Sequence, residues 1–356
     1  MYEKNYKKKI KGSILGSFIG DSIGFLFEGH SQEFIKLYLE KISSGDIINY
    51  MRGYSKKLNI NGPIHKENEK ICDWNFNFGQ YTDDSQLSLL VVDNILKNNG
   101  IFNIEYYSKQ ITKIFNEKKI VGYGSTTKNF VKNINNKISL EFSGIYSTSN
   151  GALMRSDIFG LLYFNLDDNI LFNCVKKQSF MTHMSNVSIA CSLCSAFTIK
   201  YIMKNKKIEN DMLLYELYTK IKNINIDVSN AILNLKSILL LNFNDAYKEI
   251  KKYETIKWGD NCLSSCCITT TMWALYSFLK NKNSFKKCLE TSIKVGGDVD
   301  TISKISCSFS GCYLGIDKLP KNYINKLHDR KKNVYDINLK LNKLTELIRL
   351  KKISYQ

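Results

Sequence analysis

Apolar residues recur every three or four positions over most of this chain, and strict alternation of apolar and polar residues is scarce. A period of three to four places apolar side chains on one face of a helix, whereas a period of two is typical of a half-buried strand. Only two prolines, Pro63 and Pro320, are present to interrupt helices. The pattern predicts an all-α protein, with helices in 10–27, 85–96, 104–115, 187–203, 264–279, 302–314 and from 323 onward.

The organisation of the 356 residues is that of one domain. No internal repeat and no flexible Gly/Ser linker divides the chain, so we expect a single domain over 1–356. Its motifs lie within 10–320. We interpret 44–80, which is locally rich in Gly and Asn, as an inserted lid, and 321–356 as a basic helical C-terminal tail.

The charge balance is strongly basic, with 51 Lys and Arg against 33 Asp and Glu, a formal net charge of +18. Such a surface attracts nucleic acid, phosphorylated ligands or acidic membranes. The lysines are nevertheless spread along the whole chain without a compact arginine-rich block, so general compositional bias and steering of an anionic ligand both remain open. The apolar share of 44% excludes a disordered, collagen-like or low-complexity protein.

The cysteines and the N-terminal segment bear on the compartment. Most of the ten cysteines lie in apolar or small-residue runs, which predicts buried free thiols in a reducing compartment. The basic run 7–11 precedes an apolar stretch as in a signal peptide, but Asp21 interrupts that stretch and no cleavage site follows. No 18 consecutive apolar residues occur, so we expect no transmembrane helix. We therefore expect a cytoplasmic protein without a membrane partner.

Two acidic clusters each precede an apolar helical pattern. N-capping alone explains one Thr or Asp at such a position. Each cluster, however, offers two carboxylates and a hydroxyl, and crowded carboxylates repel one another unless a cation offsets their charge. Hard oxygen donors suit Mg²⁺ or Mn²⁺, and two helix starts that meet in space form a two-metal site. Capping and metal binding both remain open for Thr82, Asp83, Asp84, Asp298, Asp300 and Thr301.

Four further segments carry candidate chemistry. Asp21 and Glu28 are two helical turns apart and can share a face. The Gly-rich helix start at 122–127 suits a phosphate, although most such segments are ordinary loops. The turn at 147–155 can bind a polar ligand or fasten loops. His183, which follows Thr182 beside an apolar helix, is either a core residue or a ligand-binding one.

Taken in their order along the chain, these motifs resemble those of one family, the ADP-ribosylglycohydrolases, which include the dinitrogenase-reductase-activating glycohydrolases. Each motif is modest alone, but their combination and order over about 16–320 are specific. The motifs are GSFIGDSIGFLFE (16–28), YTDDS (81–85), GYGST (122–126), NGALMR (150–155), TH (182–183) and GGDVDT (296–301). One departure is Met184-Ser185-Asn186, where many relatives have an acidic residue and a proline.

The resemblance implies an all-α orthogonal helix bundle with two Mg²⁺ ions in a central cleft, with Mn²⁺ as a substitute. The implied metal ligands are Thr82, Asp83, Asp84, Asp298, Asp300 and Thr301, with Asp300 bridging the ions. Glu28 and Asp298 are rival general bases, and Asp84 is a further catalytic candidate. Gly122, Gly124 and Ser125 would hold the diphosphate, and Ser147, Asn150 and His183 would line the ADP-ribose site. Asp21 is expected to support the first helix, and Arg155 to be structural.

The implied activity is hydrolysis that removes ADP-ribose from a modified target, by attack of activated water on the anomeric carbon of the distal ribose without a covalent intermediate. The alternatives are a reader that holds ADP-ribose without turnover and a two-metal phosphoryl-transfer enzyme. The partner is an ADP-ribosylated protein, an ADP-ribose-containing small molecule or an ADP-ribosylated nucleic acid, and the protein is expected to be a monomer. The motifs leave the linkage open among arginine, serine, polymer, O-acetyl-ADP-ribose and nucleic acid.

Overall fold

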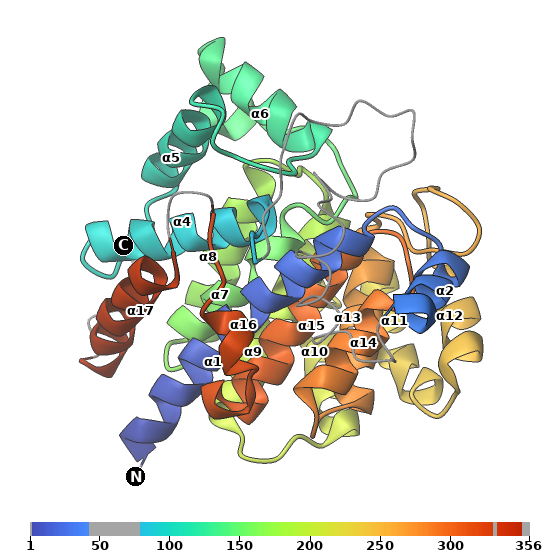
Figure 1. The fold of residues 1–356 in the computed structure, drawn as a ribbon. Coiled ribbons are helices and arrows are strands. Elements are labelled where there is room, and N and C mark those ends of the chain that lie inside the picture. The colour runs from blue at the N-terminus through green and yellow to red at the C-terminus, as the bar shows by residue number, and fades with distance from the viewer. Residues whose placement is uncertain (1, 43–78, 330–332, 351–356) are drawn as a thin grey trace.

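The fold is all-α, as predicted (Figure 1). The structure, a computed structural model, describes residues 2–42, 79–329 and 333–350. Within these ranges extended pairing is limited to isolated β-bridges. The predicted lid at 44–80 lies outside the described residues except for its last two positions. The predicted C-terminal tail is helical at Lys321–Ile324 and Val334–Arg349.

Most of the predicted segments match helices, and several helices lie outside them. The helices α8, α10, α11, α12 and α14 occupy parts of the chain for which no helix was predicted. The bounds are α1 Tyr2–Gly24, α2 Gln32–Ile42, α4 Asp83–Lys97, α5 Ile104–Asn116, α6 Ser125–Asn135, α7 Asp157–Leu162, α8 Asp168–Phe180, α9 Asn186–Lys204, α10 Asn210–Ile221, α11 Ile226–Ile238, α12 Phe243–Lys251, α13 Cys267–Lys280, α14 Phe285–Ile293, α15 Val299–Leu314, α16 Lys321–Ile324 and α17 Val334–Arg349.

Helices α1 and α15 form the most extensive helix pair of the described fold, drawn in blue and orange in Figure 1. Four glycines at four-residue spacing, Gly12, Gly16, Gly20 and Gly24, line the contact face of α1. A Cβ atom at Gly24 would lie 2.5 Å from the carbonyl oxygen of Val299. Only glycine allows two backbones to approach so closely. The contact therefore sets the end of α1 directly against the start of α15.

Two helices have the length and mean hydropathy of a membrane span, although the sequence contains no run of 18 consecutive apolar residues. These are the windows Asn5–Phe27 and Asn186–Lys204, and 89% and 83% of them, respectively, is buried inside the fold. The core helices of globular proteins show the same combination. The cysteines agree with this interior, because those at the nine described positions are all buried and free, as predicted.

Candidate active site

Three carboxylates from distant parts of the sequence meet at the end of α1. Glu28 follows the short helix η1 (Phe25–Phe27), while Asp298 and Asp300 lie at the start of α15. One oxygen atom from each of the three lies within 4.8 Å of the other two. The second acidic cluster joins them, because the hydroxyl of Thr301 lies 3.5 Å from Oδ2 of Asp84. The structure thus brings together the two predicted acidic clusters and Glu28.

The glycine pair before Asp298 has a backbone conformation that favours glycine. Gly296 and Gly297 have φ values of 73° and 83°, in the left-handed region that disfavours other residues. An added Cβ at Gly297 would also meet the backbone of Leu263. The amide of Asp298 donates to the carbonyl of Leu263 at 2.9 Å, which fastens the start of α15 to the segment before α13.

Asp21 organises the other acidic helix start. Its carboxylate accepts hydrogen bonds from the amide of Thr82 at 3.1 Å, the hydroxyl of Thr82 at 2.8 Å and the amide of Ser85 at 3.0 Å. These amides belong to the first turn of α4, where no helical partner exists for them. Burial raises the pKa of Asp21 to about 6, against these hydrogen bonds. Asp21 was predicted to support the first helix, but its carboxylate instead binds the start of α4.

Capping accounts for Thr82 but not for the carboxylates beside it. Thr82 is the N-cap of α4 and accepts from the amide of Asp84. Asp298 is the N-cap of α15 and makes no side-chain capping bond. The Oδ1 atom of Asp84 is buried and has no hydrogen-bond partner. An unpaired buried carboxylate is costly unless a cation offsets it, so these residues fit a divalent cation.

The electrostatics of the cluster point the same way. Burial raises the pKa of Glu28 well above its usual range, and the Asp298 carboxylate raises it further. The pKa of Asp300 is also raised well above its usual range, first by burial and then by the charges of Glu28 and Asp298. For Asp83 and Asp84, burial and the charge of Asp21 raise the pKa. For Asp298 burial raises the pKa, and hydrogen bonds from neighbouring side chains oppose it. Burial is the largest cause of each of these shifts, and for Glu28, Asp83, Asp84 and Asp300 the neighbouring carboxylates add to it.

The two nearest protein cations are committed to other partners. Lys304 lowers the pKa of Asp84, but its ammonium is fully buried and pairs with Asp157 at 2.7 Å. Arg155 is also fully buried and donates to Gln178, to Thr182 and to the carbonyl of Gly151. This arrangement bears out the expected structural role of Arg155. Neither side chain neutralises the cluster.

Asn150 holds one of the carboxylates in place. Its amide donates to Oδ2 of Asp298 at 2.5 Å and to the hydroxyl of Thr270 at 3.0 Å. Its backbone amide donates to the carbonyl of Ser265 at 3.0 Å. Asn150, which the sequence predicts to line the substrate site, is 5% exposed and bound to Asp298, and its substrate contact stays a prediction. The sequence analysis did not identify Thr270 as a site residue, because it lies in an apolar helical pattern that predicts only a buried core position.

The glycine-rich loop lies against the acidic cluster. A Cβ at Gly122, whose φ is 89°, would lie 3.0 Å from Oδ1 of Asp83. Gly124 is the N-cap of α6, and an added Cβ there would meet no atom within 4 Å. Ser125 opens this 11-residue helix and is exposed. Open space beside the free amides of a helix start suits a phosphate group, so the predicted phosphate role of Gly122, Gly124 and Ser125 has the required geometry.

His183 belongs to a hydrogen-bonded chain that runs from the core to the 147–150 turn. Arg155 donates to the hydroxyl of Thr182, which lies 2.8 Å from Nδ1 of His183. Nε2 of His183 lies 3.1 Å from the hydroxyl of Ser149, and this hydroxyl lies 2.8 Å from that of Ser147. His183 thus positions Ser149, which the sequence analysis did not single out, and through it Ser147.

Replacing His183 by Gln is expected to make stability less sensitive to acid. Burial, with the charge of Arg155, lowers the pKa of His183 to about 3. His183 therefore becomes protonated near pH 6.5 in the unfolded chain but stays neutral in the folded chain, so the free energy of unfolding falls as the pH drops. This group contributes a loss of about 2 kcal/mol between pH 7 and pH 5. Urea unfolding of both proteins at the two pH values measures the difference, and an identical pH dependence would contradict the neutral buried imidazole.

Sequence and fold relate this chain to proteins of one family. The model of the family described as ADP-ribosylglycohydrolase matches residues 2–352. Among curated proteins, the ADP-ribosylhydrolase ARH3 of Xenopus tropicalis is 22% identical over 338 residues, which is 85% of each chain. Human ADP-ribosylhydrolase ARH3 is 21% identical over 272 residues, covering 68% of this chain and 73% of its own. A solved structure titled ADP-ribosylglycohydrolase-related protein complex superposes with a TM-score of 0.65 at 16% identity, covering 98% of this chain and 99% of its own.

Proposed function

This chain belongs to the ADP-ribosylglycohydrolase family, and from that premise we propose that it hydrolyses the bond between a target and the distal ribose of ADP-ribose. The observation that carries the proposal is the meeting of Glu28, Asp298 and Asp300 within 4.8 Å, with the open helix start at Gly124 close by. A carboxylate cluster can activate water and stabilise a positively charged sugar, and the helix start can hold the diphosphate.

The acidic cluster is proposed to hold two divalent cations. The buried, unpartnered Oδ1 of Asp84 and the shortage of free protein cations support this assignment. Two Mg²⁺ ions, or Mn²⁺ in their place, would supply positive charge that orients the ribose hydroxyls and polarises the attacking water. The residues that would hold them are Thr82, Asp83, Asp84, Asp298, Asp300 and Thr301. Thr82 is suited to this role because its hydroxyl gives its hydrogen to Asp21, accepts from the amide of Asp84 and keeps one further oxygen lone pair.

Of the two rival general bases, the geometry favours Glu28. Asp298 is 5% exposed, and one of its oxygens is occupied by the amide of Asn150. Glu28 is partly exposed at the end of the short helix η1, and it is followed by Gly29 with a φ of 77°. A base must reach the proton that it removes. We therefore assign proton removal from water to Glu28, and a fixed, orienting role to Asp298.

The remaining residues are proposed to bind the substrate. Gly122, Gly124 and Ser125 hold the diphosphate, because their loop is exposed and directly adjoins Asp83. Ser147 would offer its hydroxyl to the ribose, kept in position by Ser149 and His183. A neutral imidazole serves this purpose well, since it fixes a hydroxyl without adding a charge near the ribose.

A release assay across linkages tests the function. The purified protein is incubated with arginine-linked, serine-linked and polymeric ADP-ribose and with O-acetyl-ADP-ribose, with Mg²⁺ or with EDTA, and products are identified by mass. We expect free ADP-ribose from at least one substrate and its loss in EDTA. Release of phosphate or AMP without ADP-ribose would instead indicate phosphoryl transfer. Tight ADP-ribose binding without release from any substrate would indicate a reader.

A further inference from the structure

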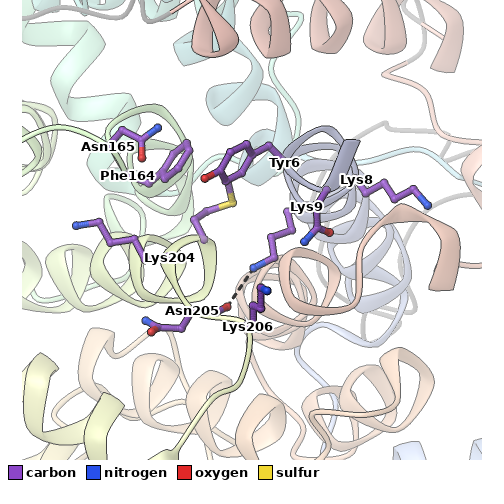
Figure 2. A pocket seen from close by; sticks show the side chains of 10 residues that line it. Tyr6, Lys8, Lys9, Phe164, Asn165, Lys204, Asn205 and Lys206 are labelled. Carbon is purple, nitrogen blue, oxygen red and sulfur yellow. Dashed lines mark hydrogen bonds between the residues drawn. The ribbon is translucent and has the colours of Figure 1, made fainter. Parts of the chain in front are cut away.

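A second cavity lies at the opposite end of α1 from the carboxylates. Its volume is about 470 Å³, and it is enclosed by the start of α1, the turn after α7 and the end of α9 (Figure 2). Lys9 in this cavity and Gly24 beside the acidic cluster are separated by fifteen residues of α1, or roughly 22 Å at the helical rise. The cavity is therefore separate from the candidate active site, and its volume falls in the range of small-molecule sites, roughly 300–1,000 Å³.

The charge of the lining is of one sign. The described residues of the lining include four lysines and no acidic residue. The ammonium of Lys8 pairs with Asp317, which is not among these lining residues. Lys204 is exposed at the end of α9. A lining in which the described charges are all positive attracts an anion from solution.

The deepest of these lysines is held in place by the end of α9. The ammonium of Lys9 is buried and donates to the carbonyls of Ile202 at 2.6 Å and Asn205 at 3.2 Å, the latter bond drawn in Figure 2. These two bonds satisfy carbonyls at the negative end of the helix, which would otherwise oppose an anion. An ammonium has three donors, so one remains for a ligand.

The apolar part of the lining offers a surface for a flat ring. Tyr6, which is partly exposed, packs on Phe164 with ring centroids 5.2 Å apart and an angle of 47° between the planes. Met203 is buried and lines the same cavity. Aromatic and thioether groups pack well against a planar ring. Three asparagines in the lining, at positions 5, 165 and 205, supply amide donors and acceptors for the edge of such a ring.

We propose that this cavity binds a free nucleoside phosphate, with its base against Tyr6 and Met203 and its phosphate toward Lys9 and Lys204. The lysines meet the negative charge of such a ligand, and the apolar wall and the amides meet its base. The volume matches one nucleotide and not a strand, so the ligand is a small molecule and not a nucleic acid.

Methionine methyl signals in NMR test this proposal at the cavity itself. Protein labelled at its methionine methyl groups is titrated with AMP in EDTA, and the signal of Met203 is assigned with Met203→Leu. We expect this signal to shift in a saturable way. Met154, in the 150–155 motif, reports separately on the candidate active site. Binding at Met203 is thus distinguished from binding near the carboxylates, whether or not the protein hydrolyses ADP-ribose.

Charge variants and other probes complete the test. Lys204→Glu is expected to weaken the AMP response of Met203 about ten-fold, and Lys204→Gln by less. Lys287→Glu, which changes an exposed lysine on α14, is the matched control and should leave the response unchanged. An unmoved Met203 signal, equal weakening in the control, or a response to a single-stranded oligonucleotide but not to AMP would each overturn the proposal. A response to inorganic phosphate as strong as that to AMP would overturn the role of Tyr6 and Met203.

Discussion

Replacing Asp300 by Ala is expected to reduce kcat/KM for ADP-ribose release at least about 10³-fold while the helical fold remains. Asp300 stands with Glu28 and Asp298 in the carboxylate cluster, and its backbone adjoins the end of α1 at Gly24. Loss of its carboxylate removes one of the oxygen donors proposed to hold the divalent cations. Turnover in saturating Mg²⁺ measures the effect, and far-UV circular dichroism verifies the fold.

Thermal unfolding gives a second measurement of the same variant. The wild-type protein should gain stability from Mg²⁺, by about 2.7 kcal/mol at a hundred times the dissociation constant. Asp300→Ala should lose most of this gain, and in EDTA it should be no less stable than the wild type, because one buried carboxylate has gone. Asp227→Ala, at an exposed position in the first turn of α11, is the control. Unchanged turnover and an unchanged Mg²⁺ effect in Asp300→Ala would reject the metal site.

Replacing Gly20 by Ala is expected to destabilise the protein by about 3 kcal/mol. An added Cβ would lie 2.6 Å from the carbonyl carbon of Ser303 and 2.9 Å from the amide nitrogen of Lys304. Both are backbone atoms of α15 and cannot rotate away, so the two helices must separate. On an exposed helix the same change would instead stabilise by up to about 1 kcal/mol, so the sign alone tests the contact.

Urea unfolding of Gly20→Ala at constant Mg²⁺ measures this loss. The control is Gly259→Ala, where the added Cβ would make only an ordinary contact at 3.6 Å with the sulfur of Cys262. We expect its free energy of unfolding to stay within about 0.5 kcal/mol of wild type. Wild-type stability in Gly20→Ala would mean that α1 and α15 do not pack backbone to backbone. Turnover should fall with stability, because α1 carries Asp21 and leads to Glu28.

The predicted helices are mainly those with an apolar stripe at regular spacing. The missed helices α10, α11 and α12 fill a part of the chain without a recognisable motif. Their starts were nevertheless marked, since Asn225 and Asn242 accept amide hydrogen bonds at the N-caps of α11 and α12. The glycines at four-residue spacing in α1 are likewise visible in the sequence, but their spacing does not identify the helix against which they pack. Their packing role depends on a partner helix almost 300 residues away.

The acidic residues of the site could be predicted because their types and spacing carry the chemistry. The residues that hold them in place could not. Asn150 reaches Asp298 across 148 positions, and Thr301 reaches Asp84 across 217. A hydroxyl or amide such as Thr270 or Ser149 serves equally well in a core, so its residue type predicts no role. Asp21 lies in an apolar helix, and only the fold shows that its partners are the amides of α4.

Helix α1 touches both halves of the acidic site. Through its glycines it lies against the start of α15, and through Asp21 it binds the start of α4. The separation of the two halves is therefore built in by folding and does not await a ligand, which is the condition for electrostatic preorganisation. The loops at 122–125 and 147–151 are attached around this frame. Gly122 adjoins Asp83 and Asn150 binds Asp298, so these two loop positions belong to the frame. At the other positions of the two loops, we expect substitutions to alter target preference while the acidic site keeps its dimensions.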